Sequence, residues 1–376
     1  MLNITLTVEQ LWQSVPGGSA TYIRELTTAL AARGDVTLTG VRARQKGEAG
    51  TASTAGPEGK GLPASMEIAD SRLPRPLLYQ GWSHLRWPRL PGSPPDVIHA
   101  TTWAIPRRSA PLVVTVHDVA FRRTPQHFTP RGVAFFERAL AITRREADVV
   151  VVPSNASRDD AIAEEIDPDR IWVIPHGVTR LPTSEDDVAR FRAQHTLTRP
   201  YVFWCGAIEP RKNLTGLLRA FGQVVHDADL DLVLAGPDGW GNAADDVRRL
   251  YEALPSGRVR VLGNLPWSDL HVAYAGARAF CFPSLWEGFG MPVLEAQTHG
   301  VPVVTSMATS MAEVCGAGAV LVDPHDDASI AAGILTAVGP KHDRLSVAAL
   351  ANAANYTWEQ SAAQHVAAYR AAITKH

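Results

Sequence analysis

The segment most informative about the fold is Ala279-Phe280-Cys281-Phe282-Pro283-Ser284-Leu285-Trp286-Glu287-Gly288-Phe289-Gly290-Met291-Pro292-Val293-Leu294-Glu295. Its first four residues are apolar and predict a buried strand. Pro292 predicts the first turn of a helix running to His299, because proline is favoured where the N–H has no helical partner. A strand, a loop and a helix in this order form the repeating unit of a doubly wound α/β sheet.

The start of this helix predicts an anion site. Its first-turn N–H groups, including those of Val293 and Leu294, would point into the crevice at the carboxyl end of the strand, where a diphosphate binds. Glu295 is placed to accept hydrogen bonds from a ribose diol, and Glu287 faces another part of the ligand. Ordinary acids and turn glycines are the alternative for each residue alone, but the set Glu287–Glu295 favours a site.

Outward from this segment, short apolar runs alternate with amphipathic stretches in both halves of the chain. This alternation predicts βαβ units and therefore an α/β fold with two doubly wound parallel-sheet domains. We place the domains at residues 1–185 and 199–356, with the linker in 179–200. A helix capped by Thr357, with Gln360 three residues on, is expected to pack residues 357–376 back on the first domain. Strands are expected at 4–8, 36–41, 97–99, 112–116, 149–152, 201–205, 230–235, 259–262, 279–283 and 301–305, and helices at 21–32 and 214–225.

The composition indicates a folded protein of 376 residues, 45% hydrophobic and 20% charged, with a net charge of −2. Three cysteines without a CxxC pair favour a reducing compartment. Because neither a signal peptide nor a run of about 18 apolar residues is evident, we expect a cytoplasmic protein. We expect no nucleic-acid partner.

An arginine-rich region spans residues 72–149, with 12 arginines and 5 acids, a net charge of +7, interleaved with Trp82, Trp87 and Trp103. Such a patch could meet anionic lipid headgroups or a phosphate-bearing acceptor. The favoured alternative is a solvated face with tryptophans in the core. Residues 45–64 are rich in Gly, Ala, Ser, Thr and Pro, and we expect a mobile loop that is either a substrate lid or a plain insertion.

Three further elements suggest chemistry. Arg211 and Lys212 follow the strand 201–205, where fixed cations would stabilise a departing nucleoside diphosphate. Gly18 lies in a Gly-Gly turn after the first strand, where backbone must approach phosphate or sugar. His117 and Asp118 follow the strand 112–116, so the imidazole could bind a sugar hydroxyl or stabilise positive charge at an anomeric carbon. Taken singly, each is more often a solvated pair, a simple turn or a core histidine.

Together these motifs resemble the retaining GT-B glycosyltransferases of family GT4, over nearly the whole chain. Four more segments contribute to the resemblance, and its most specific motif is the E-x7-E pair of Glu287 and Glu295. The resemblance implies two Rossmann-like domains facing across a deep cleft, with the last helix crossing back to the first domain. The four segments are Val152-Pro153-Ser154-Asn155, Ile174-Pro175-His176-Gly177-Val178, Ala235-Gly236-Pro237 and Leu262-Gly263.

The resemblance also implies residue roles. Glu287 would hold the transferred sugar and Glu295 the ribose, whereas Arg211 and Lys212 would hold the diphosphate. His117 would contact the transferred sugar, and Gly18 would lie where donor phosphate and acceptor meet. Ala207 stands where many relatives have arginine, so one phosphate or acceptor contact is in doubt. The remaining donor-site residues would be Gly206, Asn264, Leu265, Gly288, Phe289, Gly290, Met291, Pro292, Val293 and Leu294.

The implied reaction moves a hexose from a nucleoside-diphosphate sugar to a hydroxyl of a saccharide or lipid-linked acceptor. Anomeric configuration would be retained by a front-face mechanism, without a metal or cofactor. The sequence around His117, with Pro125 and Phe128, favours GDP-mannose, and UDP and dTDP sugars stay open. The acceptor would dock on the first domain, at 45–64 and 72–149, with peripheral contact to the inner face of an anionic membrane.

Two other kinds of protein fit the same motifs. The first is a non-catalytic nucleotide-sugar-binding subunit or sensor. The second is a GT-B epimerase or phosphorylase, although Lys341 and Lys375 lie in no recognisable pyridoxal phosphate context. Intact Glu287, Arg211 and Lys212 argue against a decayed enzyme.

Overall fold

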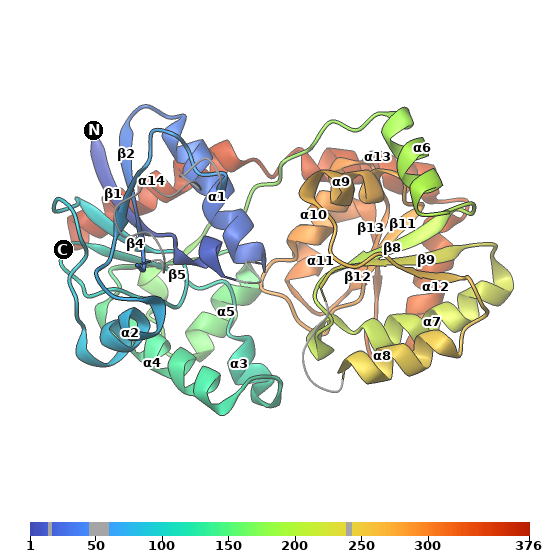
Figure 1. The fold of residues 1–376 in the computed structure, drawn as a ribbon, viewed down its shortest axis with the longest axis horizontal. Coiled ribbons are helices and arrows are strands. Elements are labelled where there is room, and N and C mark those ends of the chain that lie inside the picture. Colours follow the sequence, from blue (N-terminus) through green and yellow to red (C-terminus); the bar gives the residue numbers. More distant parts are fainter. Residues whose placement is uncertain (14–16, 45–59, 238–242) are drawn as a thin grey trace. The chain divides into compact units, whose positions relative to one another are not determined.

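The computed structural model describes residues 1–13, 17–44, 60–237 and 243–376, and the chain divides into two compact units (Figure 1). Unit 1 consists of Met1–Gly177 and Thr357–His376, and unit 2 of Val178–Tyr356. Of the expected loop at 45–64, residues 45–59 lie outside the described residues. The expected linker at 179–200 contains a helix, α6 (Glu185–Gln194), which starts with a capping box at Ser184.

Unit 1 is built on a parallel sheet of seven strands in the order β3-β2-β1-β4-β5-β6-β7. The order reverses between β1 and β4, so the chain winds outward in both directions from these central strands. The strands are β1 (Leu2–Thr7), β2 (Val36–Arg42), β3 (Glu67–Asp70), β4 (Val97–Ala100), β5 (Leu112–Thr115), β6 (Val149–Val152) and β7 (Ile171–Val173).

Helices cover the seven-stranded sheet. The last helix, α14, contacts α1 and the strands β4, β5 and β6, and α5 contacts β6 and β7. The helices of unit 1 are α1 (Gly17–Ala31), α2 (Arg75–Gln80), α3 (Ala120–Arg123), α4 (Pro130–Glu146), α5 (Asn155–Ala163) and α14 (Trp358–Lys375).

Unit 2 repeats the design with a parallel sheet of six strands in the order β10-β9-β8-β11-β12-β13. Here the order reverses between β8 and β11. The strands are β8 (Tyr201–Cys205), β9 (Asp231–Ala235), β10 (Val259–Val261), β11 (Ala279–Phe282), β12 (Val303–Ser306) and β13 (Ala319–Val322).

Helices lie on both faces of the six-stranded sheet (Figure 1). One layer contains α6, α9, α10 and α13, and the other contains α7, α8 and α12, in agreement with the contacts within each group. Besides α6, the helices of unit 2 are α7 (Leu214–Asp227), α8 (Ala243–Glu252), α9 (Trp267–Ala275), α10 (Met291–Thr298), α11 (Ser310–Val314), α12 (Asp327–Val338) and α13 (His342–Ala353).

The central strands are apolar because they are covered on both faces. Every residue of β5, β6, β8 and β11 is buried. Each strand expected from the sequence is present, with ends within two residues of those expected. Three strands were not expected, namely β3, β7 and β13. They lie at sheet edges, where one neighbour and partial exposure remove the strong apolar signal.

The C-terminal helix α14 belongs to unit 1, as expected. Its N-cap is Thr357, whose hydroxyl accepts a hydrogen bond from the N–H of Gln360 at 3.2 Å. Gly177 allows this arrangement, because a Cβ there would lie 2.3 Å from the backbone nitrogen of Trp358. The fold class is therefore confirmed: two Rossmann-like parallel-sheet domains, with the last helix returning to the first.

Candidate active site

The strands β8 and β11 are neighbours in the sheet of unit 2, although about 75 residues separate them in the chain. They pair through Phe203 and Phe280 at the position where the strand order reverses. Ligands of open α/β sheets bind at this switch point, beyond the carboxyl ends of the strands. The loops that follow these two strands are 206–213 and 283–290, which carry most of the expected site residues.

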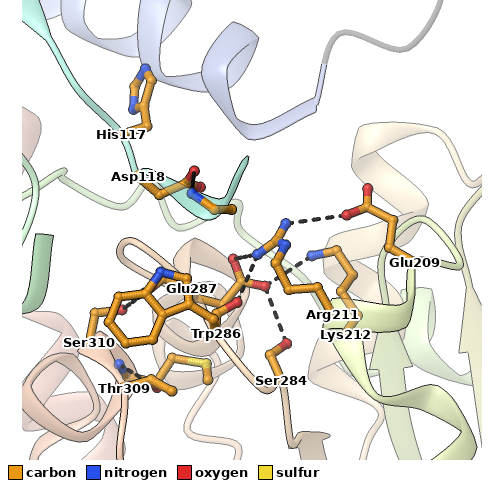
Figure 2. A network of polar contacts seen from close by, with 12 residues as sticks. His117, Asp118, Glu209, Arg211, Lys212, Ser284, Trp286, Glu287, Thr309 and Ser310 are labelled. Atoms are coloured by element: carbon orange, nitrogen blue, oxygen red, sulfur yellow. Dashed lines mark hydrogen bonds and ion pairs between the residues drawn. The ribbon is translucent and has the colours of Figure 1, made fainter. Parts of the chain in front are cut away.

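A buried cluster of charges joins the two loops (Figure 2). The carboxylate of Glu287 lies 2.6 Å from Nη1 of Arg211 and 3.3 Å from Nζ of Lys212. The hydroxyl of Ser284 donates to the same carboxylate at 3.2 Å. The hydroxyl of Ser310 donates to the backbone carbonyl of Glu287 at 2.6 Å and so fixes the loop. The structure thus brings three of the expected site residues into direct contact.

The charge state of Glu287 follows from two opposing effects. Burial by itself raises the pKa of this carboxyl, but the charges and hydrogen bonds of Arg211 and Lys212 outweigh burial and lower the pKa to about 2. Glu287 therefore stays ionised at neutral pH, and its oxygens only accept hydrogen bonds. A carboxylate held in this state is suited to bind hydroxyl groups.

The two cations are held from several sides. Arg211 donates to the backbone carbonyl of Trp286 at 2.9 Å and lies 3.3 Å from the carboxylate of Glu209. The Nζ of Lys212 lies 4.8 Å from the centre of the Phe282 ring. Gly206 leaves room for the lysine, because a Cβ there would lie 2.8 Å from Lys212 Cδ. The cations are therefore positioned before any ligand binds.

The helix α10 has Pro292 in its first turn, as the sequence predicts, and its N-cap is Gly290. Gly290 has φ of +92°, and a Cβ there would lie 2.7 Å from Cγ of Met311, so this position requires glycine. The prediction of a free N–H at Val293 was wrong, because this group donates to the carbonyl of Gly290 at 2.9 Å. This hydrogen bond closes a tight turn at the start of α10, so the N–H of Val293 is not available to a ligand.

The second glutamate of the segment lies apart from the charged cluster. Glu295 is buried on α10 and accepts a hydrogen bond from the hydroxyl of Tyr274 at 2.9 Å. This hydroxyl also lies 2.8 Å from the sulfur of Cys205. Burial raises the pKa of Cys205 to about 12 and raises that of Tyr274 far above its usual value, so both stay protonated. Tyr274 was not expected, since nothing in its local sequence indicates a contact with Glu295.

The remaining expected donor-site residues differ in what they can offer. The side chains of Phe289 and Leu294 pack with Val314 in a small apolar cluster, and Val293 belongs to the main core of unit 2. They can therefore contribute only backbone groups to a ligand. Asn264 is exposed and Leu265 half-buried in the loop after β10.

In unit 1, His117 follows the buried strand β5. Its Nε2 donates to the backbone carbonyl of Thr101 at 3.0 Å, which fixes the neutral tautomer. Burial lowers the pKa of His117, despite the opposite effect of Thr101 and Asp118. The carboxylate of Asp118 accepts from the N–H of Ala120 at 3.0 Å, which gives it a local structural role. Gly18 is exposed in the first turn of α1.

Behind His117, unit 1 contains a buried chain of hydrogen bonds that the sequence did not indicate. The chain connects α14 to β4, β5 and α1. Its contacts run from Tyr369 Oη to His99 Nδ1 (2.8 Å), from His99 Nε2 to Thr115 Oγ1 (2.7 Å), from Thr115 Oγ1 to Tyr22 Oη (2.9 Å), from Tyr22 Oη to His365 Nε2 (2.9 Å) and from His365 Nδ1 to the Ser361 carbonyl (2.7 Å).

One end of this chain determines the direction of every bond. A carbonyl only accepts, so Nδ1 of His365 donates to Ser361 and Nε2 of the neutral ring accepts from Tyr22. The hydroxyl of Tyr22 then accepts from Thr115, and the same logic continues to Tyr369. Burial lowers the pKa of His365 to about 4, consistent with a ring that must stay neutral.

Within the described parts of the chain, no group of three His, Cys, Asp or Glu side chains is placed to bind a metal ion. No helix in the same described residues has the length and hydropathy needed to cross a membrane.

Two family models match the chain, "Glycosyltransferase Family 4" over residues 16–180 and "Glycosyl transferases group 1" over residues 186–349. O-antigen chain mannosyltransferase B of Escherichia coli is 33% identical over 291 residues, which are 73% of this chain and 74% of that protein. The MMP alpha-(1->4)-mannosyltransferase of Mycolicibacterium hassiacum is 27% identical over 297 residues, 72% of this chain and 68% of that protein.

Solved structures show the same fold. Anabaena Alr3699/HepE, in complex with UDP and glucose, superimposes with a TM-score of 0.73 at 20% identity, covering 98% of this chain and 100% of that one. WaaG, a glycosyltransferase involved in lipopolysaccharide biosynthesis, superimposes with a TM-score of 0.70 at 16% identity, covering 97% of this chain and 98% of that one.

Proposed function

Because the chain belongs to glycosyltransferase family 4, we propose that it transfers a hexose from a nucleoside-diphosphate sugar to a hydroxyl of a saccharide or lipid-linked saccharide. Transfer retains the anomeric configuration and needs no metal ion. The observation that carries this proposal is the buried carboxylate of Glu287, ionised between Arg211 and Lys212 at the carboxyl ends of neighbouring strands.

The chemistry follows from these charges. The acceptor oxygen attacks the anomeric carbon on the side from which the leaving group departs. The bond from that carbon to the phosphate oxygen breaks, and its electron pair goes to the nucleoside diphosphate. Arg211 and Lys212 stabilise the growing negative charge. The departing phosphate takes the acceptor proton, so no separate strong base is required.

The other residues receive roles around this step. Glu287 accepts hydrogen bonds from the transferred sugar, and Glu295 accepts them from the ribose. The amides at the start of α10 bind the diphosphate, and the nucleobase of the donor lies at Asn264 and Leu265. His117 contacts the transferred sugar, and Gly18 lies where the donor phosphate meets the acceptor.

Mannose is the proposed sugar. Both sequence relatives described above are named as mannosyltransferases, and one of them is 33% identical. The solved structure of HepE contains UDP and glucose, so UDP-hexoses are the second choice of donor. GDP-mannose is therefore the first donor to test.

A donor panel tests the proposal. The protein is incubated with GDP-mannose, UDP-glucose and a dTDP-hexose, and mass spectrometry follows nucleoside diphosphate and sugar products. Release of nucleoside diphosphate with one donor, and transfer to a saccharide with retained configuration, is the expected result. Binding without release indicates a sensor, and an altered sugar on an intact nucleotide indicates an epimerase. Either outcome contradicts the proposal.

We further propose peripheral contact with an anionic membrane through the arginine-rich region 72–149. Several of its arginines pair with acids, such as Arg123 with Asp160 and Arg144 with Glu164, so only part of its charge is available. Flotation with anionic vesicles at low and high salt tests this contact, which salt should weaken. Equal flotation with neutral vesicles contradicts it.

A further inference from the structure

Unit 1 contains a cavity of about 770 Å³ whose wall includes His117 and Asp118. The volume falls within the roughly 300–1,000 Å³ of small-molecule sites. The wall includes the loops after β4 and β5, α2 and the turn that follows it, and one face of α4. The segment after β1 and the start of α1 complete it. The cavity is thus large enough for several sugar rings or for one ring with substituents.

Aromatic rings form much of this wall. Tyr79 and Phe135 stack with their centres 5.8 Å apart, and Phe121 and Phe136 lie 5.3 Å apart. Trp103 meets Phe121 edge-on at 5.7 Å. Aromatic walls with a few polar groups are typical of sites for small organic ligands, and the C–H face of a pyranose packs well on such rings.

Two arginines of α4, Arg131 and Arg138, also line the cavity. They are seven residues apart and therefore lie on one face of the helix. In the described parts of the chain neither forms an ion pair, and Nε of Arg138 is buried without a hydrogen-bond partner. By contrast, Arg144 and Arg145 of the same helix each pair with a carboxylate.

The cavity itself offers these cations little compensation. Among the described lining residues, Asp118 carries the only carboxylate, and this group accepts from the N–H of Ala120. A partly buried guanidinium without a partner is unfavourable unless a ligand supplies an anion. Guanidinium groups bind phosphate particularly well, because their donors match two phosphate oxygens.

We propose that this cavity binds the acceptor, and that the acceptor is a saccharide bearing a phosphate group. Its rings pack on the aromatic wall, and its phosphate binds Arg138 with help from Arg131. This inference rests on the proposed function and names its acceptor class. The phosphate belongs either to a free sugar phosphate or to a diphosphate link to a lipid.

Binding is measured by calorimetry on the full chain with the donor site saturated by GDP. The probes are mannose 1-phosphate, mannose joined through diphosphate to a short prenyl chain, and methyl mannoside. We expect the wild type to bind a phosphorylated probe at least about tenfold more tightly than methyl mannoside. Tighter binding of the prenyl probe assigns the phosphate to a lipid carrier, and equal binding assigns it to a free sugar phosphate.

Arg138→Gln should lose this preference, whereas the matched control Arg145→Gln on the same helix should keep it. Arg138→Gln removes an unpaired charge, so it should not lower the melting temperature. Arg131→Gln is a second variant, at an exposed position. No phosphate preference in the wild type, or a preference that Arg138→Gln retains, overturns the inference.

Release of nucleoside diphosphate without acceptor is measured on the same proteins. Unchanged release in Arg138→Gln, with the phosphate preference lost, supports the acceptor assignment. Donor turnover by a wild type without phosphate preference overturns the acceptor assignment alone. If the wild type turns over no nucleotide sugar, the proposed function itself fails.

Discussion

Unit 2 buries a carboxylate and keeps it charged, whereas unit 1 buries histidines and keeps them neutral. Glu287 is ionised because Arg211 and Lys212 contact it directly. His99 and His365 are neutral because burial disfavours the charged ring and each nitrogen has an assigned donor or acceptor role. Pairing and hydrogen bonding are thus two ways to bury an ionisable group.

This difference also separates what the two regions can do. A charged cluster can exchange one partner for a ligand, because each member retains others. The hydrogen-bond chain cannot exchange a partner in this way. A proton added to the accepting nitrogen of a histidine ring would face the hydroxyl hydrogen that already points at that nitrogen. We therefore expect the charged cluster to bind ligands and the hydrogen-bond chain to hold α14 against the rest of unit 1.

Breaking the charged cluster should have the largest effect. Glu287→Ala leaves two partly buried cations without their shared partner. Turnover should fall by about 10²–10³-fold, and unit 2 should lose about 3–5 kcal/mol of stability. Nucleotide release and chemical denaturation measure the two effects. Asp327→Asn, which removes an exposed pair with Arg219, is the control, and near wild-type turnover in Glu287→Ala contradicts the site assignment.

Removing one cation should have a smaller effect on the same cluster. Lys212→Ala leaves Arg211 to hold Glu287, so the fold should persist. Turnover should fall by about a hundredfold, because one of two charges facing the leaving group is lost. The release assay with a saturating donor measures this change, with Arg219→Ala as a surface control. If Lys212→Ala weakens donor binding but keeps full turnover at a saturating donor concentration, Lys212 does not stabilise the leaving group.

Breaking the neutral chain should affect stability rather than chemistry. Tyr22→Phe removes the hydroxyl between Thr115 and His365, and unit 1 should lose about 1–3 kcal/mol. Hydrogen exchange along α14 should become faster. Tyr251→Phe, at a tyrosine that is 39% exposed on α8, should change neither quantity. If hydrogen exchange along α14 is unchanged in Tyr22→Phe, the hydrogen-bond chain does not hold this helix.

The two regions should differ in their response to acid. Burial lowers the pKa of His365 from 6.5 to about 4, so its contribution to stability is complete above 6.5 and is lost as the pH falls toward 4. The pKa of Glu287 is lowered from 4.5 to about 2. Its contribution to stability is therefore complete down to about pH 4.5 and is lost as the pH falls toward 2. At pH 5.5 unit 1 should therefore lose about 1 kcal/mol through His365.

Hydrogen exchange at α14 between pH 7 and pH 5 measures this loss. His365→Gln should reduce the pH dependence, and His271→Gln, in unit 2, should leave it unchanged at α14. The same dependence in His365→Gln as in the wild type excludes His365 as its source.

Much of the fold could be predicted because it is encoded locally. Gly290 and Pro292 define the start of α10, and Thr357 defines the start of α14, since caps depend on a few adjacent residues. The edge strand β3 could not be predicted, because it has four residues, of which the two ends, Glu67 and Asp70, are charged, and its pairing comes from β2.

The candidate site was only partly predictable. The motifs placed Glu287, Arg211 and Lys212 at strand ends, but their mutual contacts depend on β8 and β11 being neighbours. The partners Ser284 and Ser310 carried no recognisable signal, because serines are common in loops and at the starts of helices.

The sequence by itself determined the two doubly wound units, the helix starts and the types of residue at the strand ends, because periodicity, capping and turn chemistry act over a few residues. Only the tertiary structure decided which of these residues meet. It paired Glu287 with two cations, directed the chain from Tyr369 to Ser361, and left Arg138 facing a cavity without a described partner. Charge state depends on burial and on neighbours from distant segments, and these arise only when the strands take their order in the sheet.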